Sequence, residues 1–468
     1  MKKNSKTTGL LLSILLIILS ACETQTGNEK EDVDFGSLKT SYKKGEIVVS
    51  YQNEKNAPFL KDSVRSFILK KFPDAKQLEC SKCLNLVELW RAEGIEYFMN
   101  DLLEQFSEGH GEIKKTTPIA TAGATGDEWL AVSLNYEFEV ESAKSDSLDS
   151  VFNSDLYPIR ENLVLAVLDS GLDFEYFPNE FLKETDPLSG CYSETAFGWN
   201  FTVDGGNDNI NDETSSKHGT LVNLYILEEV VNNSGYIPRF LNIKVLDEDN
   251  KGTLFSLLCG FHFARQQRAH IVNASLGFYV DGDFSEFKYG KHPMMTYLTR
   301  DFLEGHQMLV VAAAGNENGD PHNNRNLEEN AFYPAVLSHL GEKDSTNFVA
   351  VTTSDNAGTS ISSSQNYSSI YVDAAIRSDI ENGFGFYLPF GRNNQEESVS
   401  GSSFAAAILT GQIVNRWDSL SEIDFRKNSK SEWKQQVIPI GNFTSRELER
   451  LSNKVNRGIS YPRLNNRQ

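Results

Sequence analysis

The sequence predicts a doubly wound α/β domain over residues 155–420, with a mostly parallel sheet and helices on both faces, preceded by a small α+β domain over residues 45–142. Two observations support this fold class. In the C-terminal part, continuous apolar runs end in small or polar residues, as buried parallel strands do, and helical patterns lie between several of them. In the N-terminal part, strand-like runs alternate with amphipathic helical stretches.

Length and charge limit the class of protein. The 468 residues are 39% hydrophobic and 23% charged, a globular composition with room for one large domain or a few ordinary ones. The formal net charge of −21 argues against nucleic acid as a partner, because phosphates require a basic face.

The first residues are predicted to be a signal peptide, residues 1–21. Lysines precede a short apolar stretch and then small residues, which is the order of a secretory signal. The stretch "LSAC" resembles the lipobox of bacterial lipoproteins. This resemblance implies cleavage before Cys22, a lipid on Cys22, and an exported protein anchored to a membrane of the bacterial cell envelope. A plain secretory signal that happens to contain a cysteine is the alternative.

The predicted elements of the α+β domain follow a polar tether over residues 22–44. Strands are expected at "GEIVVSY", "LNLVELWRA" and "EWLAVSLNYEFEV", and helices at "FLKDSVRSFILKKF" and "GIEYFMNDLLEQFSEG". Residues 143–154 are a polar linker without apolar periodicity.

In the α/β domain, strands are expected at "NLVLAVLDSG", "FLNIKVLD", "AHIVNASLG", "QMLVVAAAGN" and "NFVAVTT", with a helix at "TLFSLLCGFHFARQQ". Functional residues of such folds gather at the carboxyl ends of the strands. Residues 421–468 form a basic tail without a motif, and we expect it to pack on the catalytic domain.

Four polar residues stand at predicted strand ends or helix starts. Asp169 closes the first strand, His218 begins an apolar helix, Asn316 ends a later strand, and Ser403 opens the helical run "SFAAAILTG". A lone residue of this kind is usually a helix cap. All four in this order within one α/β domain are uncommon, and they indicate a catalytic site.

At these residues the chain resembles the subtilases, the subtilisin-like serine peptidases. Asp-His-Ser is the chain order of that family. Its three motifs are present as "DSG" at Asp169, "HGT" at His218 and "GSSFA" at residues 401–405, and "NASLG", "AAAGN" and "YPA" resemble further family segments. The resemblance implies a subtilisin-like fold and a serine endopeptidase that hydrolyses protein or peptide substrates through an acyl-enzyme.

The resemblance also implies the role of each residue. Ser403 would be the nucleophile, activated by His218 as the base, and Asp169 would orient the imidazole. Asn316 would stabilise the oxyanion together with the backbone N–H of Ser403. No cofactor is required. The substrate backbone would be bound by residues at two strand ends: Ser275, Leu276, Gly277, Ala313, Ala314 and Gly315.

Some positions depart from the family pattern. Lys217 stands where glycine is usual and would lower the pKa of His218 slightly by like-charge repulsion. Leu221, Asn223 and Ala407 replace a histidine, an alanine and a proline. None of these changes removes a reacting group. The alternative is a catalytically inactive subtilase-fold lipoprotein that binds peptides or acts as a scaffold.

The sequence does not decide how the cysteines are used. Cys80 and Cys83 form a CxxC pair, but the context of a redox or zinc site is missing. Disulfide pairing among these two, Cys191 and Cys259 cannot be read from the sequence.

A metal site is also open. The loop "DGGNDNINDET" is rich in oxygen ligands, and similar loops in some subtilases hold calcium. Asp204, Asp208 and Asp212 are the candidate ligands of a structural calcium ion. A solvated acidic loop is the other interpretation.

The α+β domain lies where subtilases often carry a propeptide, and its order of strands and helices resembles that of their inhibitory chaperone domain. A permanent accessory domain is the alternative. If the domain is a propeptide, self-cleavage near residues 141–155 would free the catalytic domain from the lipid on Cys22, because Cys22 lies upstream. Specificity and oligomeric state are not readable from the sequence.

Overall fold

The computed structural model describes most of the chain from residue 41 onward, and the described residues fall in one compact unit, residues 39–468. They are residues 41–51, 57–107, 120–125, 128–140, 157–186, 191–192, 196–233, 236–280, 308–317, 325–340, 346–379, 384–385, 398–420, 432–438, 449–451, 454–455 and 459–461. The predicted signal peptide, Cys22 and the predicted linker lie outside them. No helix within these ranges is long and apolar enough to cross a membrane.

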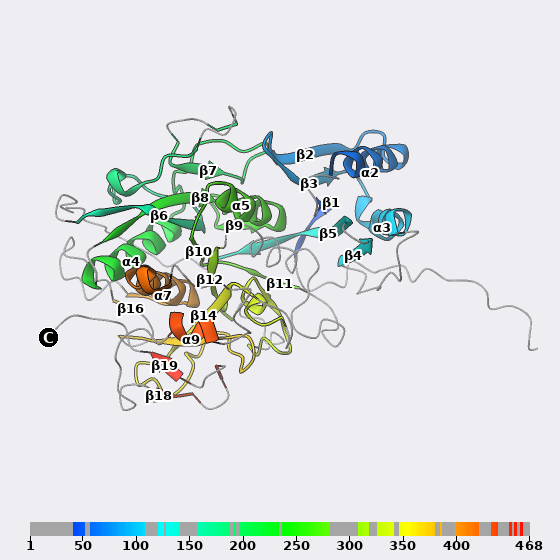
Figure 1. The fold of residues 1–468 in the computed structure, drawn as a ribbon. Coiled ribbons are helices and arrows are strands. Elements are labelled where there is room, and N and C mark those ends of the chain that lie inside the picture. The colour runs from blue at the N-terminus through cyan, green and yellow to red at the C-terminus, as the bar shows by residue number, and fades with distance from the viewer. Residues whose placement is uncertain are drawn as a thin grey trace, which may run out of the picture. The chain divides into compact units, whose positions relative to one another are not determined.

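The α+β domain is an antiparallel sheet with two α-helices packed on each other and on its strands (Figure 1). The strand order is β2-β3-β1-β5-β4. In chain order, the elements are β1 (Tyr42–Tyr51), α2 (Ala57–Lys71), β2 (Lys76–Ser81), β3 (Leu84–Arg91), the 3₁₀ helix η2 (Ile95–Phe98), α3 (Met99–Ser107), β4 (Ala120–Thr125) and β5 (Glu128–Glu139).

The predicted strands and helices of this domain are all present, and the first strand begins within the predicted tether, at Tyr42. β2 and β4 were not predicted. β4 reads "ATAGAT", whose small residues carry no apolar alternation that would mark a strand. The helices pack through aromatic rings, since Phe67 of α2 stacks on Phe98 at 5.1 Å between centroids and meets the edge of Phe106 of α3 at 5.7 Å.

The α/β domain is built on a nine-stranded sheet with the order β18-β19-β15-β14-β12-β10-β6-β8-β7. All neighbouring pairs are parallel except β18 with β19. Its strands are β6 (Ile159–Asp169), β7 (Gly198–Asn200), β8 (Ile237–Lys244), β10 (Ile271–Ala274), β12 (Leu309–Ala313), β14 (Phe348–Ser354), β15 (Ala374–Arg377), β18 (Glu449–Arg450) and β19 (Ile459–Tyr461). The prediction of a mostly parallel sheet is confirmed.

Short strands outside this sheet form small pairs. β9 (Lys251–Thr253) is antiparallel to β5 of the α+β domain. The other pairs are β11 (Phe278–Tyr279) with β13 (Phe332–Tyr333), and β16 (Phe384–Gly385) with β17 (Ser398–Val399).

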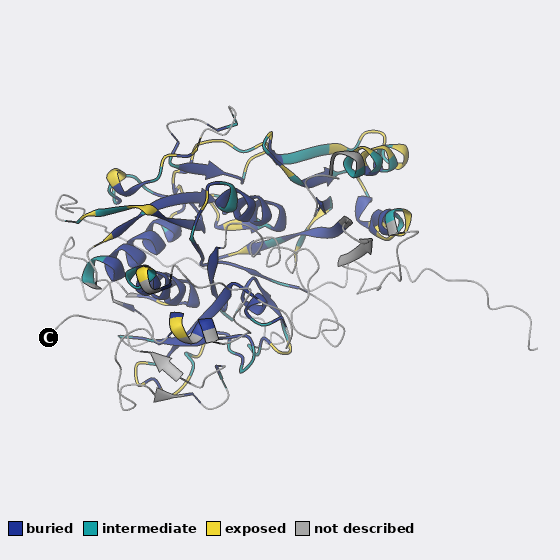
Figure 2. Cartoon of the chain, viewed as in Figure 1, coloured by how far each residue is buried: buried dark blue, intermediate teal, exposed yellow. Residues whose placement is uncertain are grey.

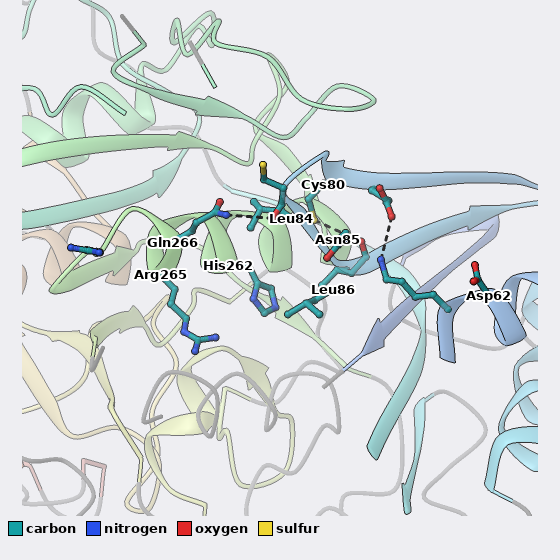
Figure 3. A pocket seen from close by; sticks show the side chains of 13 residues that line it. Asp62, Cys80, Leu84, Asn85, Leu86, His262, Arg265 and Gln266 are labelled. Atoms are coloured by element: carbon teal, nitrogen blue, oxygen red, sulfur yellow. Dashed lines mark hydrogen bonds and ion pairs between the residues drawn. The ribbon is translucent and has the colours of Figure 1, made fainter. Parts of the chain in front are cut away.

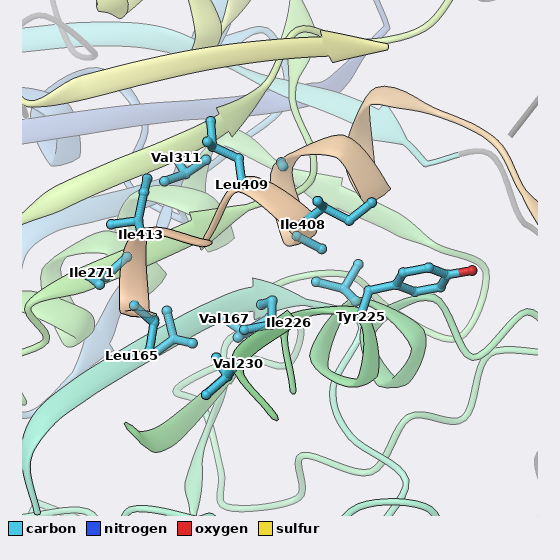
Figure 4. Packing of buried hydrophobic residues seen from close by; sticks show 14 of the residues in the cluster. Leu165, Val167, Tyr225, Ile226, Val230, Ile271, Val311, Ile408, Leu409 and Ile413 are labelled. Atoms are coloured by element: carbon cyan, nitrogen blue, oxygen red, sulfur yellow. The ribbon is translucent and has the colours of Figure 1, made fainter. Parts of the chain in front are cut away.

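Helices cover both faces of the large sheet. Side chains alternate between the two faces of a strand. On β6, Leu165 and Val167 belong to the apolar cluster that contains residues of α4 and α7 (Figure 4). Leu168 instead faces Gly260 of α5. The helices of the domain are η4 (Asn179–Phe181), α4 (His218–Asn233), α5 (Leu254–Gln266), η6 (Ala335–Ser338), α7 (Ser402–Asn415), α8 (Trp417–Leu420) and α9 (Glu432–Val437).

α4 and α7 are in close contact. α7 is buried from Ser402 to Val414 (Figure 2), as expected for a helix that is apolar on all sides. A Cβ on Gly411 would lie 2.5 Å from the Cβ of Glu229 and 2.8 Å from the carbonyl oxygen of Ile226, both on α4. The missing side chain at Gly411 therefore sets how near the two helices can come.

The described part of the C-terminal tail packs on the α/β domain. Nζ of Lys434 in α9 lies 2.8 Å from both carboxylate oxygens of Asp373 and donates to the carbonyl oxygen of Ser338 at 2.7 Å. Both charged side chains are about 5% exposed, so removing one of them would leave a buried, uncompensated charge.

Two disulfides join the α+β domain to the α/β domain. Cys80 at the end of β2 is bonded to Cys259 in α5, and Cys83 in the turn after β2 is bonded to Cys191. The CxxC pair is therefore neither a redox pair nor part of a zinc site, because each cysteine has its partner in the other domain.

We expect Gly411→Ala to destabilise the protein, because its methyl group would overlap Glu229 and the backbone of α4. Overpacking of this kind typically costs about 1–3 kcal/mol, more than the gain in helix propensity of about 1 kcal/mol. Thermal unfolding would show the loss. Gly205→Asn is the control, since a Cβ at Gly205 meets nothing within 4 Å and asparagine is among the residues that tolerate its φ of +77°. Equal unfolding temperatures for Gly411→Ala and wild type would contradict the packing argument.

Candidate active site

Asp169 and His218 form a buried pair at the carboxyl end of the inner strand β6. Asp169 is the last residue of β6 and His218 the first of α4. Nδ1 of His218 lies 2.7 Å from Oδ1 of Asp169, and each side chain is 1% exposed. The same oxygen accepts the backbone N–H of Ser170 at 2.8 Å. The carboxylate thereby favours the tautomer with the proton on Nδ1, which leaves Nε2 with its lone pair.

Ser403 lies in the first turn of α7, directly after a sharp turn of the backbone. Gly401 there has φ +127°, a value that residues with a side chain rarely adopt. The Ser403 hydroxyl donates to the carbonyl oxygen of Ser275 at 2.9 Å, and the Ser275 hydroxyl donates to the carbonyl oxygen of Ser403 at 2.7 Å. This reciprocal pair fixes the start of α7 to the segment after β10.

The structure does not join Ser403 to His218 by a hydrogen bond. Nε2 of His218 is buried and has no hydrogen-bond partner among the described residues. The His218 ring is 5.6 Å from the ring of Phe404, the neighbour of Ser403. The Ser403 hydroxyl must give up its hydrogen bond to Ser275 before it can donate to the imidazole. Such bonds often form only when substrate is bound.

Asn316 is held by the residue before Ser403. Its Oδ1 accepts the backbone N–H and the hydroxyl of Ser402, both at 3.1 Å, and the Ser402 hydroxyl accepts the backbone N–H of Gly315 at 2.9 Å. With the oxygen bound in this way, the Asn316 amide presents its nitrogen as a donor on the other side.

The six predicted substrate-binding residues follow the ends of β10 and β12, two neighbouring strands, and all are buried. Ser275, Leu276 and Gly277 come after β10. A Cβ on Gly277 would lie 2.3 Å from the carbonyl oxygen of Tyr333, so only glycine fits there. Ala313 ends β12, and it is followed by Ala314 and Gly315. The reciprocal bonds of Ser275 bring the first of these segments beside Ser403.

The charge of Asp169 controls the pKa of His218. Burial alone lowers this pKa, but the Asp169 charge and hydrogen bond raise it, and the charge of Asp212 adds to them, so that the net shift is upward. Lys217, which was expected to lower this pKa slightly, is not among the causes of the shift. The Lys217 ammonium forms an ion pair with Asp173 at 2.9 Å, which compensates its charge.

A buried carboxylate links the end of β6 to the start of α4. Oδ1 of Asp212 accepts the Ser170 hydroxyl at 3.1 Å, and the hydroxyl and backbone N–H of Thr214 at 2.6 and 3.3 Å. Its Oδ2 accepts the backbone N–H and hydroxyl of Thr220 at 3.0 and 2.8 Å. Because Ser170 follows Asp169 and Thr220 lies in the first turn of α4, Asp212 fixes the segments that carry the carboxylate–imidazole pair.

The three candidate calcium ligands do not converge in the structure. Asp204 accepts two hydrogen bonds from the Arg91 guanidinium, at 2.8 and 2.9 Å, Asp208 is exposed, and Asp212 is enclosed by the hydroxyls described above. The described residues contain no group of three or more His, Cys, Asp or Glu side chains placed to hold a metal ion.

Two further side chains were not predicted. The Tyr279 hydroxyl donates to the carbonyl oxygen of Asn316 at 2.9 Å and accepts from Nδ2 of Asn366 at 2.7 Å. Asn366 also donates to the carbonyl oxygen of Ala314 at 2.9 Å. Both residues brace the segment after β12, but neither lies in a motif that could have revealed this.

Comparisons with known proteins show the family of the chain. A model of the subtilase family matches residues 160–422, more than half of the chain. The chain belongs to the subtilase family. This subtilase is 26% identical over 224 residues to the minor extracellular protease Epr of Bacillus subtilis (strain 168), an alignment that covers 45% of this chain and 29% of that protein. It thus spans less than a third of that relative's length.

Among solved structures, the subtilase is similar to a lanthipeptide protease. The TM-score is 0.36 with 18% sequence identity, over 59% of this chain and 78% of that chain.

We expect Asp212→Asn to lower the pKa of His218, because the variant removes a negative charge that raises it. A histidine NMR titration would measure the shift, with His218→Gln used to assign the signal. Asp208→Asn is the control, since Asp208 is exposed and is not among the causes of the His218 shift. An unchanged His218 pKa in Asp212→Asn would show that Asp212 acts by hydrogen bonding alone.

Proposed function

We propose that this subtilase is an active serine endopeptidase that hydrolyses protein substrates through Asp169, His218 and Ser403. The observation that carries the proposal is the buried contact of 2.7 Å between the Asp169 carboxylate and Nδ1 of His218. The His218 ring lies beside Phe404, the residue after Ser403. The contact with Asp169 leaves Nε2, which has no hydrogen-bond partner among the described residues, available as a base.

In the proposed reaction, His218 acts first as a base and then as an acid. Nε2 of His218 takes the Ser403 proton as Oγ bonds to the substrate carbonyl carbon, and the imidazolium then protonates the leaving amine. Water, deprotonated by the same nitrogen, hydrolyses the acyl-enzyme and restores Ser403. Asp169 remains ionised throughout and stabilises the imidazolium.

The oxyanion would be stabilised by the Asn316 amide nitrogen and the backbone N–H of Ser403. The position of Oδ1 against Ser402 supports this role, because the oxygen of the amide is already bound and its nitrogen is the donor. We further propose that an extended substrate binds along residues 275–277 and 313–315. Main-chain recognition of this kind suits protein substrates of varied sequence.

We also propose an exported protein that is anchored to the cell envelope by a lipid on Cys22. Cys22 lies outside the described residues, so this proposal comes from the signal sequence. The two disulfides support the exported location, because disulfides form and persist in oxidising compartments.

The test of the peptidase is covalent labelling with a fluorophosphonate probe, which reports an activated serine without a known substrate. We expect folded wild type to be labelled, and both Ser403→Ala and His218→Ala to lose the label. Thermal unfolding would show that the variants are folded. An unlabelled, folded wild type would instead favour the inactive peptide-binding protein.

Asn316→Ala should slow labelling and peptide hydrolysis without abolishing them. Loss of one oxyanion donor costs about 2.7–4 kcal/mol of barrier, a range measured on a subtilisin, itself a member of this family. We therefore expect kcat to fall roughly 100- to 1000-fold with little change in KM. Steady-state kinetics would separate the two, and a change confined to KM would assign Asn316 to substrate binding.

A further inference from the structure

The face of the α/β domain formed by α5 and β9 is covered by the chain's own α+β domain. β5 pairs with β9, with Glu137 opposite Thr253 and Glu139 opposite Lys251. The Nδ2 end of Asn135 donates to Glu46 within the α+β domain, while its Oδ1 accepts the backbone N–H of Phe255 at the start of α5, at 3.0 Å.

Aromatic and charged contacts extend this interface. The rings of Tyr136 and Phe138 on β5 both stack on Phe278, with centroids 5.6 and 5.9 Å apart. Arg91 at the end of β3 forms an ion pair with Asp204 at 2.8 Å. These contacts come from the ends of β5 and β3.

The packing between β3 and α5 is incomplete. A cavity of about 730 Å³ lies there, lined by Leu84, Asn85 and Leu86 on one side and by His262 and Arg265 of α5 on the other (Figure 3). Cys80 and Cys83 also border this cavity. The two disulfides therefore join the domains at the place where the packing between β3 and α5 is interrupted.

We propose that the face formed by α5, β9 and Phe278 is a permanent interface with the α+β domain of the same chain. The α+β domain stays attached to this face after any cleavage of the peptide chain between the domains. Each disulfide joins a cysteine that precedes residues 141–156 to one that follows them: Cys80 to Cys259, and Cys83 to Cys191. Hydrolysis of a peptide bond between the domains breaks one connection and leaves these two.

With both disulfides intact, self-cleavage near residues 141–155 would not by itself free the catalytic domain from Cys22. Release requires both disulfides to be reduced as well. That reduction forms four thiols and takes four electrons and four protons, which two equivalents of a dithiol supply as they become cyclic disulfides. The α+β domain is thus a retained part of the processed molecule, as in the accessory-domain alternative, whether or not it also acts as a propeptide.

The two links differ in exposure. Cys80 is 2% exposed and Cys259 is fully buried, whereas Cys83 and Cys191 are only half-buried. Thiols reach exposed disulfides first. We therefore expect a mild dithiol to open Cys83–Cys191 while Cys80–Cys259 still holds the domains together.

The test uses the full chain in the Ser403→Ala background, with the site of an unrelated sequence-specific protease inserted after Lys144. After cleavage and alkylation of free thiols, we expect one undivided band on a denaturing gel without reductant and two fragments with reductant. Two fragments without reductant would overturn the proposal. Because an external protease makes the cut, the result is independent of the proposed peptidase activity.

Cysteine variants identify each link. Cys80→Ser with Cys259→Ser, and Cys83→Ser with Cys191→Ser, each leave one disulfide, and we expect both double variants to remain undivided without reductant. The variant with all four serines should separate. Mass spectrometry of peptides from the unreduced, unmodified chain gives a second readout, which does not depend on how the variants fold. Absence of the peptide pairs joining Cys80 to Cys259 and Cys83 to Cys191 would also overturn the proposal.

Discussion

The candidate site depends on the close approach of two buried helices. α4 begins with His218 and α7 begins beside Ser403, and both lie on the same face of the large sheet. Their contact at Gly411 allows the two helix starts to meet at the carboxyl ends of the parallel strands. Asp169 at the end of β6 and Asn316 shortly after β12 lie at the same edge of the sheet. The four residues thus come from four segments that are far apart in the sequence.

Burial makes the electrostatics of this site demanding. The Asp169–His218 pair and the carboxylate of Asp212 lie in a region almost closed to water. An unpaired charge there would be costly. Both oxygens of Asp212 accept hydrogen bonds from backbone and hydroxyl groups, and Oδ1 of Asp169 accepts the backbone N–H of Ser170 and faces Nδ1 of His218. The same donors hold the segments in place. Charge compensation and positioning are therefore accomplished by one set of hydrogen bonds.

The sequence predicted the family and the mostly parallel sheet, because those signals are contiguous. Asp169, His218 and Ser403 each sit in a short motif. Each of the five predicted apolar strands overlaps an observed strand, although "FLNIKVLD" runs three residues beyond the end of β8 at Lys244. Asp212 could be read only as an acidic loop residue, since its partners Ser170 and Thr220 lie outside that loop. The pairing of the cysteines likewise depends on which surfaces meet in three dimensions. The effect of Lys217 on His218 could not be foreseen for the same reason, because its neutralising partner Asp173 lies 44 residues earlier.

The disulfides also constrain how the protein reaches its native state. The bonded cysteines are 179 and 108 residues apart, while Cys80 and Cys83 are near enough in sequence to oxidise with each other first. Correct pairing thus requires that the surfaces of both domains are already formed when oxidation occurs, or that a thiol isomerase reshuffles early errors. Closing a loop of about 100 residues lowers the entropy of the unfolded chain by an amount worth on the order of 5 kcal/mol. Protein recovered from a reducing cytosol would lack that contribution, which makes an oxidising compartment the appropriate place for its production.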